Sequence, residues 1–217
     1  MMDDVKKDDV LPAKNELPES EFEHLQTGPN LFVETIRLMI IALAIVLPIR
    51  IFIVAPFIVE GASMEPNYHN AEYLLVDEIS YRFQKPERGD VVVFRPPDNQ
   101  SIFYIKRVIA LPGETIMIKD QKISIINSEN PEGLLLSEDS YIDGSSASES
   151  EFSKITLKDN EYFVLGDNRG NSRDSRVLGP INIDFIKGKV MLRVFPFNKL
   201  SLAQRPEYGL LSNTTNN

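Results

Sequence analysis

The chain has 217 residues, of which 42% are hydrophobic and 25% are charged, as is usual for a folded protein. Its formal net charge of -9 argues against a general nucleic-acid-binding protein, which would usually carry a basic patch. The absence of cysteine excludes disulfides, cysteine nucleophiles and thiolate metal sites, and the two histidines, His24 and His69, are a poor basis for a zinc site. We therefore expect no metal, no cofactor and no nucleic-acid partner.

The N-terminal part divides into a polar and an apolar segment. Residues 1–30 are polar, acidic and without clear periodicity, which predicts a disordered tail. Every residue of 38–47 is apolar, and Arg50 is the only charge in 38–59. Because a bilayer core about 30 Å thick needs ~20 helical residues, we expect a transmembrane anchor over 31–55.

Two other interpretations of the apolar segment are a buried core helix and a cleaved signal peptide. The long acidic lead before Arg37 argues against the signal peptide. A long polar domain that follows a span is translocated largely regardless of its charge. We therefore expect a single-pass protein of the plasma (inner) membrane that contacts the lipid bilayer, with a cytoplasmic N-terminus and its main domain on the outer face.

Beyond the anchor the pattern changes to short β-like runs that are separated by turns. The predicted strands are 72–79, 90–96, 101–111, 114–119, 122–127, 153–157, 161–167 and 189–197. We expect a mainly β fold: a twisted, mostly antiparallel, barrel-like sheet at 56–198, which forms the main domain on the one N-terminal transmembrane helix. Residues 199–217 are expected to form a flexible C-terminal tail.

The stretch GASMEPNY (61–68) raises the question of whether Ser63 is a turn residue or a nucleophile. A serine needs a base to become a nucleophile, and the usual base is histidine. His24 lies across the membrane in the expected topology, and His69 belongs to a polar turn, so a Ser-His-Asp triad is not expected. Lysine is the remaining candidate base.

Lys106 lies inside an apolar strand, where alternation puts Tyr104, Lys106 and Val108 on one face. It is either a lysine that reaches water at an edge or a buried lysine held neutral. An unperturbed lysine titrates near 10.4, so a base near neutral pH needs a pKa lower by about 3 units, worth ~4 kcal/mol. Burial can lower a lysine pKa by that much, and the like charge of Arg107 acts in the same direction.

The segment GDNRGNSRDSR (166–176) gathers charges and amides behind a predicted strand. A solvated loop is the default interpretation of such a composition. A rigid polar loop that supports a site is the alternative, because its charged residues can pair with one another. These residues are Asp167, Arg169, Arg173, Asp174 and Arg176.

Four segments together resemble the type I signal peptidases. They are SMEP (63–66), RGDVVVF (88–94), YIKRVIALPGE (104–114), and GDNRGNSRDSR with the following LGP (166–180), in the order and spacing of that family. The resemblance implies a membrane-anchored serine endopeptidase with a Ser-Lys dyad. Its substrates would be exported preproteins, from which it removes signal peptides by cutting after small residues such as alanine at the first and third positions before the cut.

The resemblance also implies residue roles. Ser63 would be the nucleophile, Lys106 the general base and then the acid for the leaving amine, and Ser172 would hydrogen-bond to Lys106 and orient it. The supporting charge pairs would be Asp174 with Arg176 and Asp167 with Arg107. The substrate pocket would involve Val59, Met64, Val93, Tyr104 and Ile105.

The chain departs from the family pattern near the nucleophile. Gly61 replaces a serine whose hydroxyl, in some members, completes the oxyanion hole with the N–H of the nucleophile. A backbone N–H freed by the glycine geometry is one candidate for this second donor. Asn67 replaces the usual threonine, and Asn70-Ala71 replace a Gly-Asp pair; we expect these turn residues not to touch the chemistry.

Three other classes of protein remain in view. A self-cleaving repressor-type Ser-Lys protease shares the base chemistry but would carry a DNA-binding helical domain. A non-catalytic anchored β domain would tolerate the loss of Ser63 or Lys106. A conventional serine hydrolase is opposed by the histidine count.

Overall fold

The computed structural model describes residues 30–52, 54–142, 152–208 and 210–211, with the side chains of 48–52, 152–153 and 210–211 outside the description. The chain divides into two compact units, one ending at Ile45 and one starting at Val46. The tail predicted at 1–30 lies outside the described residues except for Asn30. The second unit contains every strand that the structure describes and the candidate site.

Helix α1 spans Leu31–Phe52 and coincides with most of the predicted anchor. Its apolar residues are spread around the whole helix, and those described up to Leu47 are largely exposed. Within the part of the chain that the structure describes, no helix meets the length and apolar character needed to cross a membrane.

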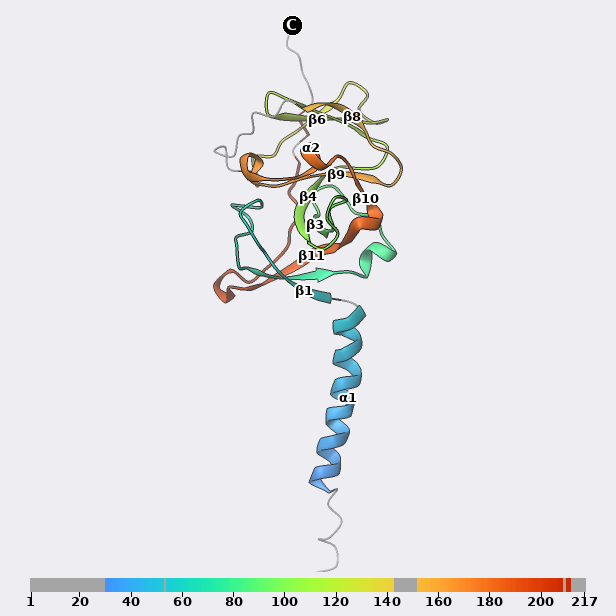
Figure 1. Cartoon of the computed structure of the whole chain (residues 1–217), viewed down its shortest axis with the longest axis vertical. Coiled ribbons are helices and arrows are strands. Elements are labelled where there is room, and N and C mark those ends of the chain that lie inside the picture. The colour runs from blue at the N-terminus through green and yellow to red at the C-terminus, as the bar shows by residue number, and fades with distance from the viewer. Residues whose placement is uncertain (1–29, 53, 143–151, 209, 212–217) are drawn as a thin grey trace, which may run out of the picture. The chain divides into compact units, whose positions relative to one another are not determined.

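The first sheet has eight strands in the order β1-β2-β11-β3-β4-β9-β10, with β12 beside β11, and its strand pairs run antiparallel (Figure 1). Its strands are β1 (Val54–Ile58), β2 (Tyr73–Asp77), β3 (Val91–Phe94), β4 (Tyr104–Ala110), β9 (Glu161–Leu165), β10 (Ile181–Asn182), β11 (Ile186–Phe195) and β12 (Ser201–Leu202). Register shifts interrupt the pairing of β11 with β2 and with β3, a sign of β-bulges.

The second sheet has five antiparallel strands in the order β13-β7-β6-β5-β8. They are β5 (Thr115–Lys119), β6 (Lys122–Ile126), β7 (Leu134–Leu136), β8 (Phe152–Thr156) and β13 (Leu210–Leu211). The second sheet packs against β4 and β9 through a shared apolar cluster that includes Ile109, Phe163 and Ile116.

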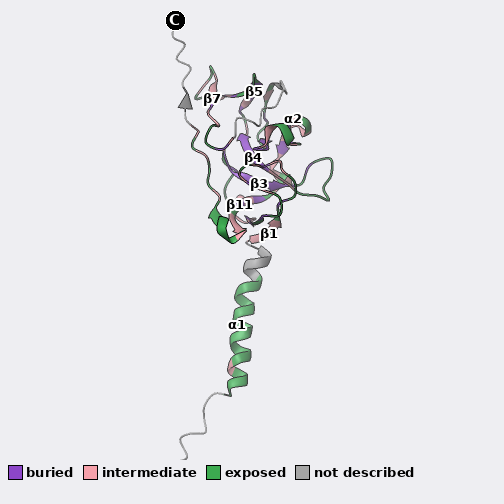
Figure 2. Cartoon of the chain, turned by 90° about the vertical axis from the view of Figure 1, so that its left-hand side faces the viewer, coloured by how far each residue is buried: buried purple, intermediate pink, exposed green. Residues whose placement is uncertain are grey.

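Strands β3 and β4 lie in the middle of the core. Val91 and Val93 belong to one apolar cluster and Val92 and Phe94 to another, so β3 is buried on both faces. Strand β4 is buried from Lys106 onward, and Figure 2 shows β3 and β4 largely in the colour of buried residues. A charged side chain on β4 therefore enters a largely desolvated environment.

Short helical turns connect the strands of the first sheet. They are η3 (Ser80–Arg82), η4 (Arg169–Asn171), α2 (Ser175–Leu178), η5 (Ile183–Phe185) and η6 (Phe197–Lys199). Two of them, η4 and α2, lie within the charged loop after β9.

The prediction of a mainly β, mostly antiparallel fold is confirmed, and each of the eight predicted strands overlaps an observed one. The short strands β1, β7, β10, β12 and β13 were not predicted. Strand β1 could not be recognised in the sequence, because its residues continue the apolar run of α1 and no change of pattern marks the boundary.

The flexible tail predicted at 199–217 is wrong for its first part. Strand β12 pairs with β11, and β13 pairs with β7. Between them, Arg205 donates to Asp90 (2.6 Å, Nε to Oδ1), and the Tyr208 ring packs against that of Tyr141. These contacts give the polar tail buried partners that its composition does not reveal.

Candidate active site

Ser63 lies in the loop 59–72 that connects β1 to β2. Two backbone bonds close the base of this loop, from Val59 N to Glu72 O and from Ala71 N to Val59 O, both 2.9 Å. At its tip, Asn168 fixes the nucleophile from the other side. Its N–H donates to Ser63 O (3.0 Å), and its Nδ2 donates to Ala62 O (3.1 Å).

Lys106 reaches Ser63 from the middle of the first sheet. Its strand, β4, pairs with β3 on one side and β9 on the other. The Lys106 residue is 3% exposed, and its Nζ donates to Ser63 Oγ (2.7 Å) and to Ile105 O (2.8 Å). Of the two interpretations of Lys106, an edge lysine that reaches water or a buried lysine, the fold therefore adopts the buried one, because β4 is an interior strand.

Burial lowers the pKa of the Lys106 ammonium from 10.5 to about 8. Desolvation is the largest cause, since a buried site disfavours the charged form. The carboxylates of Asp174 and Asp167 partly oppose it, and the guanidinium of Arg176 acts with it. Lys106 is therefore a buried base that can lose its proton within the physiological range.

Gly166 allows the loop after β9 to approach the nucleophile closely. A Cβ at this position would lie 2.2 Å from Ser172 Oγ and 2.5 Å from Ser63 O, distances that real side chains do not show. Any side chain here would push Ser172 and the nucleophile loop apart. The glycine of the GDNR segment is thus required for packing.

Ser172 lies beside the site, but the predicted hydrogen bond to Lys106 is not formed. Among the described residues, Ser172 Oγ is buried and has no hydrogen-bond partner of acceptable geometry. Lys106 Nζ instead donates to Ser63 Oγ and Ile105 O. Ser172 Oγ is still close enough to the Asp174 carboxylate to contribute to the lowering of its pKa.

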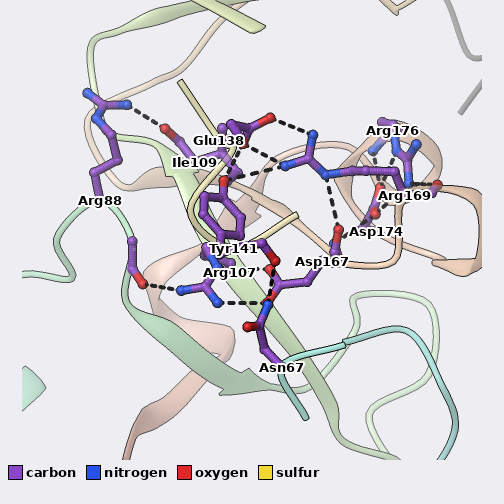
Figure 3. Close-up of polar contacts among 12 residues, drawn as sticks. Asn67, Arg88, Arg107, Ile109, Glu138, Tyr141, Asp167, Arg169, Asp174 and Arg176 are labelled. Atoms are coloured by element: carbon purple, nitrogen blue, oxygen red, sulfur yellow. Dashed lines mark hydrogen bonds and ion pairs between the residues drawn. The ribbon is translucent and has the colours of Figure 1, made fainter. Parts of the chain in front are cut away.

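The two predicted charge pairs are present. Arg107 donates to Asp167 from Nε (2.8 Å) and Nη2 (2.6 Å), and Arg176 donates to Asp174 from Nε (2.8 Å) and Nη2 (2.8 Å). Figure 3 shows both bidentate pairs. Arg107 also donates from Nη1 to Gly89 O (3.0 Å), in the turn that precedes β3.

Asp174 connects the second pair to the backbone of the site. Its Oδ2 accepts from Gly166 N (3.0 Å). Burial alone would raise the pKa of the Asp174 carboxyl, but the Arg176 guanidinium and the Gly166 N–H hold it below its usual value. The carboxylate thus stays charged while it is buried, as paired and hydrogen-bonded charges can.

The sequence did not point to three further members of this polar network. Glu138 accepts from Arg169 Nη1 (2.7 Å) and Nη2 (2.6 Å), and the Arg107 guanidinium lies over the Tyr141 ring, 4.4 Å from its centre. Asn67 donates to Asp167 (Figure 3). Glu138 and Tyr141 belong to a segment without a motif, so no pattern in the sequence indicated that they lie at the site. For Asn67, the departure from the family's threonine could have indicated a contact that is particular to this chain.

A cleft of about 510 Å³ opens at Ser63 and Lys106. The predicted pocket residues Val59, Val93, Tyr104 and Ile105 line it. Met64 does not line this cleft; it is fully buried beneath the nucleophile, in the apolar cluster that contains Val59 and Val93. Its role is to support the floor of the cleft.

The structure also bears on the oxyanion donors. Ser63 N–H donates to no group among the described residues, so it is free to face a substrate. Gly61 has a φ of +88°, which favours glycine, but its N–H donates to Asn70 Oδ1 (2.9 Å). Because it already has this acceptor, the Gly61 N–H is not a free candidate for the second oxyanion donor.

The other candidate ligands and bases lie apart from this arrangement. His69 Nδ1 is 3.6 Å from Glu72 Oε1, while the hydrogen-bond partner of Ser63 Oγ is Lys106. Across the described ranges there is no group of three or more histidine, cysteine or acidic side chains that could hold a metal ion.

Comparison with known proteins places the chain among peptidases. The sequence profile of the family described as signal peptidase, peptidase S26, matches residues 32–195. Signal peptidase I S of Bacillus subtilis (strain 168) is 36% identical over 171 residues, which cover 77% of this chain and 91% of that protein. A probable signal peptidase I-2 of Synechocystis sp. is 32% identical over 178 residues, covering 80% of this chain and 78% of that protein.

A solved structure of a signal peptidase I from Enterococcus faecalis V583 aligns with 49% of this chain and 97% of that chain, at 31% identity and a TM-score of 0.40. The family match alone spans more than half of the chain, and the relatives match it over most of their length. The chain therefore belongs to the peptidase S26 family, a family of signal peptidases. Within it the chain is a signal peptidase I, a serine peptidase that removes signal peptides from preproteins.

Proposed function

We propose that this enzyme cleaves its preproteins with a Ser63-Lys106 dyad. The observation that carries the proposal is the 2.7 Å contact between Lys106 Nζ and Ser63 Oγ, made by a lysine that is 3% exposed. A nucleophile and a base within hydrogen-bond reach, with the base desolvated, is the arrangement that activates a hydroxyl.

The proposed reaction follows from this contact. Neutral Lys106 takes the proton of Ser63 Oγ as that oxygen attacks the scissile carbonyl carbon, and Ser63 N–H stabilises the negative charge that develops on the carbonyl oxygen. Protonated Lys106 then gives its proton to the leaving amine as the C–N bond breaks. Water, deprotonated by the same lysine, attacks the acyl-enzyme and frees Ser63.

Energetics favour this use of Lys106. Lowering its pKa from 10.5 to about 8 corresponds to about 3 kcal/mol at 1.36 kcal/mol per unit. At pH 7 roughly one molecule in ten then has a neutral lysine, compared with fewer than one in a thousand for an unperturbed one. Burial in β4 thus supplies most of the pKa decrease of about 3 units that a lysine base needs near neutral pH.

The proposed substrate rule is cleavage after small residues at the first and third positions before the cut. Its support is the cleft at Ser63, which is walled by Val59 (4% exposed), Val93 (3% exposed) and Ile105. We propose that these packed side chains accept a methyl group and that a large side chain would have to displace them. Overpacking of this kind costs about 1 to 3 kcal/mol.

We further propose that residues 31–55 anchor the enzyme in the plasma (inner) membrane, with a cytoplasmic N-terminus, the catalytic domain on the outer face and no nucleic-acid partner. The uninterrupted apolar run of 38–47 and the lack of a polar face on α1 support an apolar surrounding for this helix. Ser63 lies eight residues beyond the end of this anchor at residue 55, and extended chain covers at most ~3.4 Å per residue. A preprotein whose signal peptide is still in the bilayer would present its cleavage point within that reach.

The experiment is cleavage of a preprotein by the full chain in detergent, with sequencing of the new N-terminus. We expect one cut after a small residue in the wild type and none in Ser63→Ala or Lys106→Ala. The double variant should be no worse than either single one, because residues that act as a unit are not additive. Cleavage by folded Ser63→Ala would refute the dyad.

A further inference from the structure

We infer that Asn67 is a positioning residue of this enzyme, which holds the nucleophile loop to the carboxylate that pairs with Arg107. Its side chain joins Ser63 and Lys106 into one closed ring of contacts. The inference rests on the proposed dyad, because positioning matters only if Ser63 and Lys106 react together.

The amide of Asn67 makes two hydrogen bonds outside its own loop. Its Nδ2 donates to Tyr141 O (2.7 Å) and to Asp167 Oδ2 (2.9 Å). Both partners are pure acceptors, and the two N–H donors of the asparagine NH₂ group serve both. Figure 3 shows the Asn67 side chain directed at Asp167, beside the Arg107 guanidinium.

The backbone of Asn67 is held as firmly as its side chain. Its N–H donates to Met64 O (3.0 Å), which ties it to the turn that bears the nucleophile. Its carbonyl oxygen accepts from Arg193 Nη1 (2.9 Å), and that guanidinium also pairs with Glu72. Movement of the Asn67 side chain is therefore passed directly to the turn around Ser63.

A ring of contacts then connects nucleophile and base. Ser63 contacts Lys106, and the next residue of β4, Arg107, forms a bidentate pair with Asp167. Asp167 accepts from Asn67, whose loop returns to Ser63. Since successive residues of a strand point to opposite faces, the nucleophile loop contacts the groups on both faces of β4. Asn67 provides the contact on the side opposite Lys106.

Asp167 couples this ring to the basicity of Lys106. Its negative charge acts to raise the pKa of the Lys106 ammonium. The other groups that face Lys106 are Asp174, Arg176 and the Tyr104 ring. Those that face Asp167 are Arg107, Arg169 and Tyr68. The Asn67 amide disperses part of the Asp167 charge, so its removal exposes Lys106 to a stronger negative potential.

A threonine at this position has one hydroxyl donor where asparagine has two. It can satisfy Asp167 or Tyr141 O, but not both. The replacement of the family's usual threonine by Asn67 therefore adds a second bond, from the nucleophile loop to the segment that contains Tyr141.

The test compares Asn67→Ala and Asn67→Thr with Asn127→Ala in the full chain, assayed with a preprotein from pH 6 to pH 10. Asn127 is a matched control, because its Nδ2 donates to Glu114 (3.1 Å), a carboxylate that pairs with Arg88 in another part of the domain. The folded fraction of each variant is measured by urea unfolding, and kcat is expressed per folded molecule.

We expect Asn67→Ala to lower kcat on the order of 10-fold with little change in KM, as loss of alignment rather than of binding does. The acid limb of its pH profile should move to higher pH. Asn67→Thr should be intermediate, and Asn127→Ala should keep the wild-type kcat and limb. An Asn67→Ala variant that loses activity only in proportion to its unfolded fraction, with an unmoved limb, overturns the inference.

If Asn67→Ala does not fold, the inference is tested with Asn67→Thr alone. A wild-type kcat and a wild-type acid limb of the pH profile in that variant overturn the inference. Ser63→Ala is assayed alongside. Activity in folded Ser63→Ala refutes the dyad itself, whereas an inactive Ser63→Ala with an unaffected Asn67 series refutes only the positioning role.

Discussion

Two clusters of the same make-up lie in different parts of the domain. The Asp167 cluster consists of Arg107, Asp167 and Asn67, and the Glu114 cluster consists of Arg88, Glu114 and Asn127. In each, an arginine lies 2.6 Å from a carboxylate oxygen, and an asparagine Nδ2 donates to the same carboxylate. They differ in burial, since the paired side chains are 4% and 1% exposed in the first and 19% and 9% in the second.

The two clusters also differ in the parts of the domain that they contact. The Glu114 cluster joins the turns before β3 and β5 to the end of β6, and its carboxylate accepts from Leu111 N (2.8 Å). The Asp167 cluster adjoins Lys106, whose pKa falls to about 8, and the loop of Ser63. An arginine–carboxylate pair that is joined by an asparagine amide is thus found both away from the site and beside it. It becomes part of a chemical site only where it holds a nucleophile and a desolvated base together.

The largest expected difference between the two clusters is the loss of stability when the carboxylate of each is replaced by an amide. Asp167→Asn leaves the Arg107 guanidinium buried without a counter-charge, which costs about 3 to 5 kcal/mol of stability. Glu114→Gln should cost less, because Arg88 is partly exposed and can be hydrated. Urea unfolding measures both changes.

Turnover per folded molecule separates the two clusters further. It should fall in Asp167→Asn and stay at the wild-type value in Glu114→Gln. Equal losses of turnover in the two variants would show that the clusters are equivalent and that the Asp167 cluster has no special link to the site.

Lys106→Met should stabilise the folded chain at neutral pH. The Lys106 pKa is about 8 when folded and 10.5 when free, so the buried charge costs up to about 3 kcal/mol below pH 8. Between these pH values the unfolded state binds more protons, so wild-type stability rises with pH and the advantage of methionine disappears near pH 10.5.

The measurement is the difference in unfolding free energy between Lys106→Met and the wild type at pH 7 and at pH 10. Lys122→Met, at an exposed position of β6, is the control and should give a difference that does not change with pH. A constant difference for Lys106→Met as well would mean that Lys106 is not desolvated.

The smallest expected effect concerns the walls of the cleft. Ile105→Ala should relax the preference for alanine over phenylalanine before the cut, which we expect to be roughly 10- to 200-fold in the wild type, since overpacking costs about 1 to 3 kcal/mol. Rates are measured on preproteins with Ala, Val, Leu or Phe at the first and third positions.

Ile116→Ala is the matched control, because Ile116 is fully buried in the cluster between the sheets and does not line the cleft. It should lower stability by about 2 to 5 kcal/mol and keep the wild-type preference. A wild-type enzyme that cuts the Phe series as fast as the Ala series would contradict the proposed substrate rule and favour a broader protease.

The sequence was informative where local pattern decides structure. Alternating apolar residues and turn residues located the long strands, and the scarcity of histidine directed attention to Lys106. Strand β13 could not be predicted, because it has only two residues and pairs with β7 far away in the chain. Strand β7 was missed because it has only three residues.

The same limit applies to the site. Motif spacing singled out Ser63, Lys106 and the charged loop, but not which hydrogen bonds they form. Whether Lys106 binds Ser172 or Ile105 O depends on side-chain positions within a packed core, and Glu138 contacts Arg169 across a long stretch of sequence. Tertiary contacts of this kind leave no local pattern.

The pH dependence of kcat/KM tests the account most directly. Only neutral Lys106 accepts the proton of Ser63, so kcat/KM should rise about tenfold per pH unit at low pH and level off above a pKa of about 8. His69→Ala should leave this rise of kcat/KM with pH unchanged. The account would be contradicted if kcat/KM instead levelled off near pH 6.5, the usual histidine pKa, and if this pH dependence disappeared in a folded His69→Ala variant.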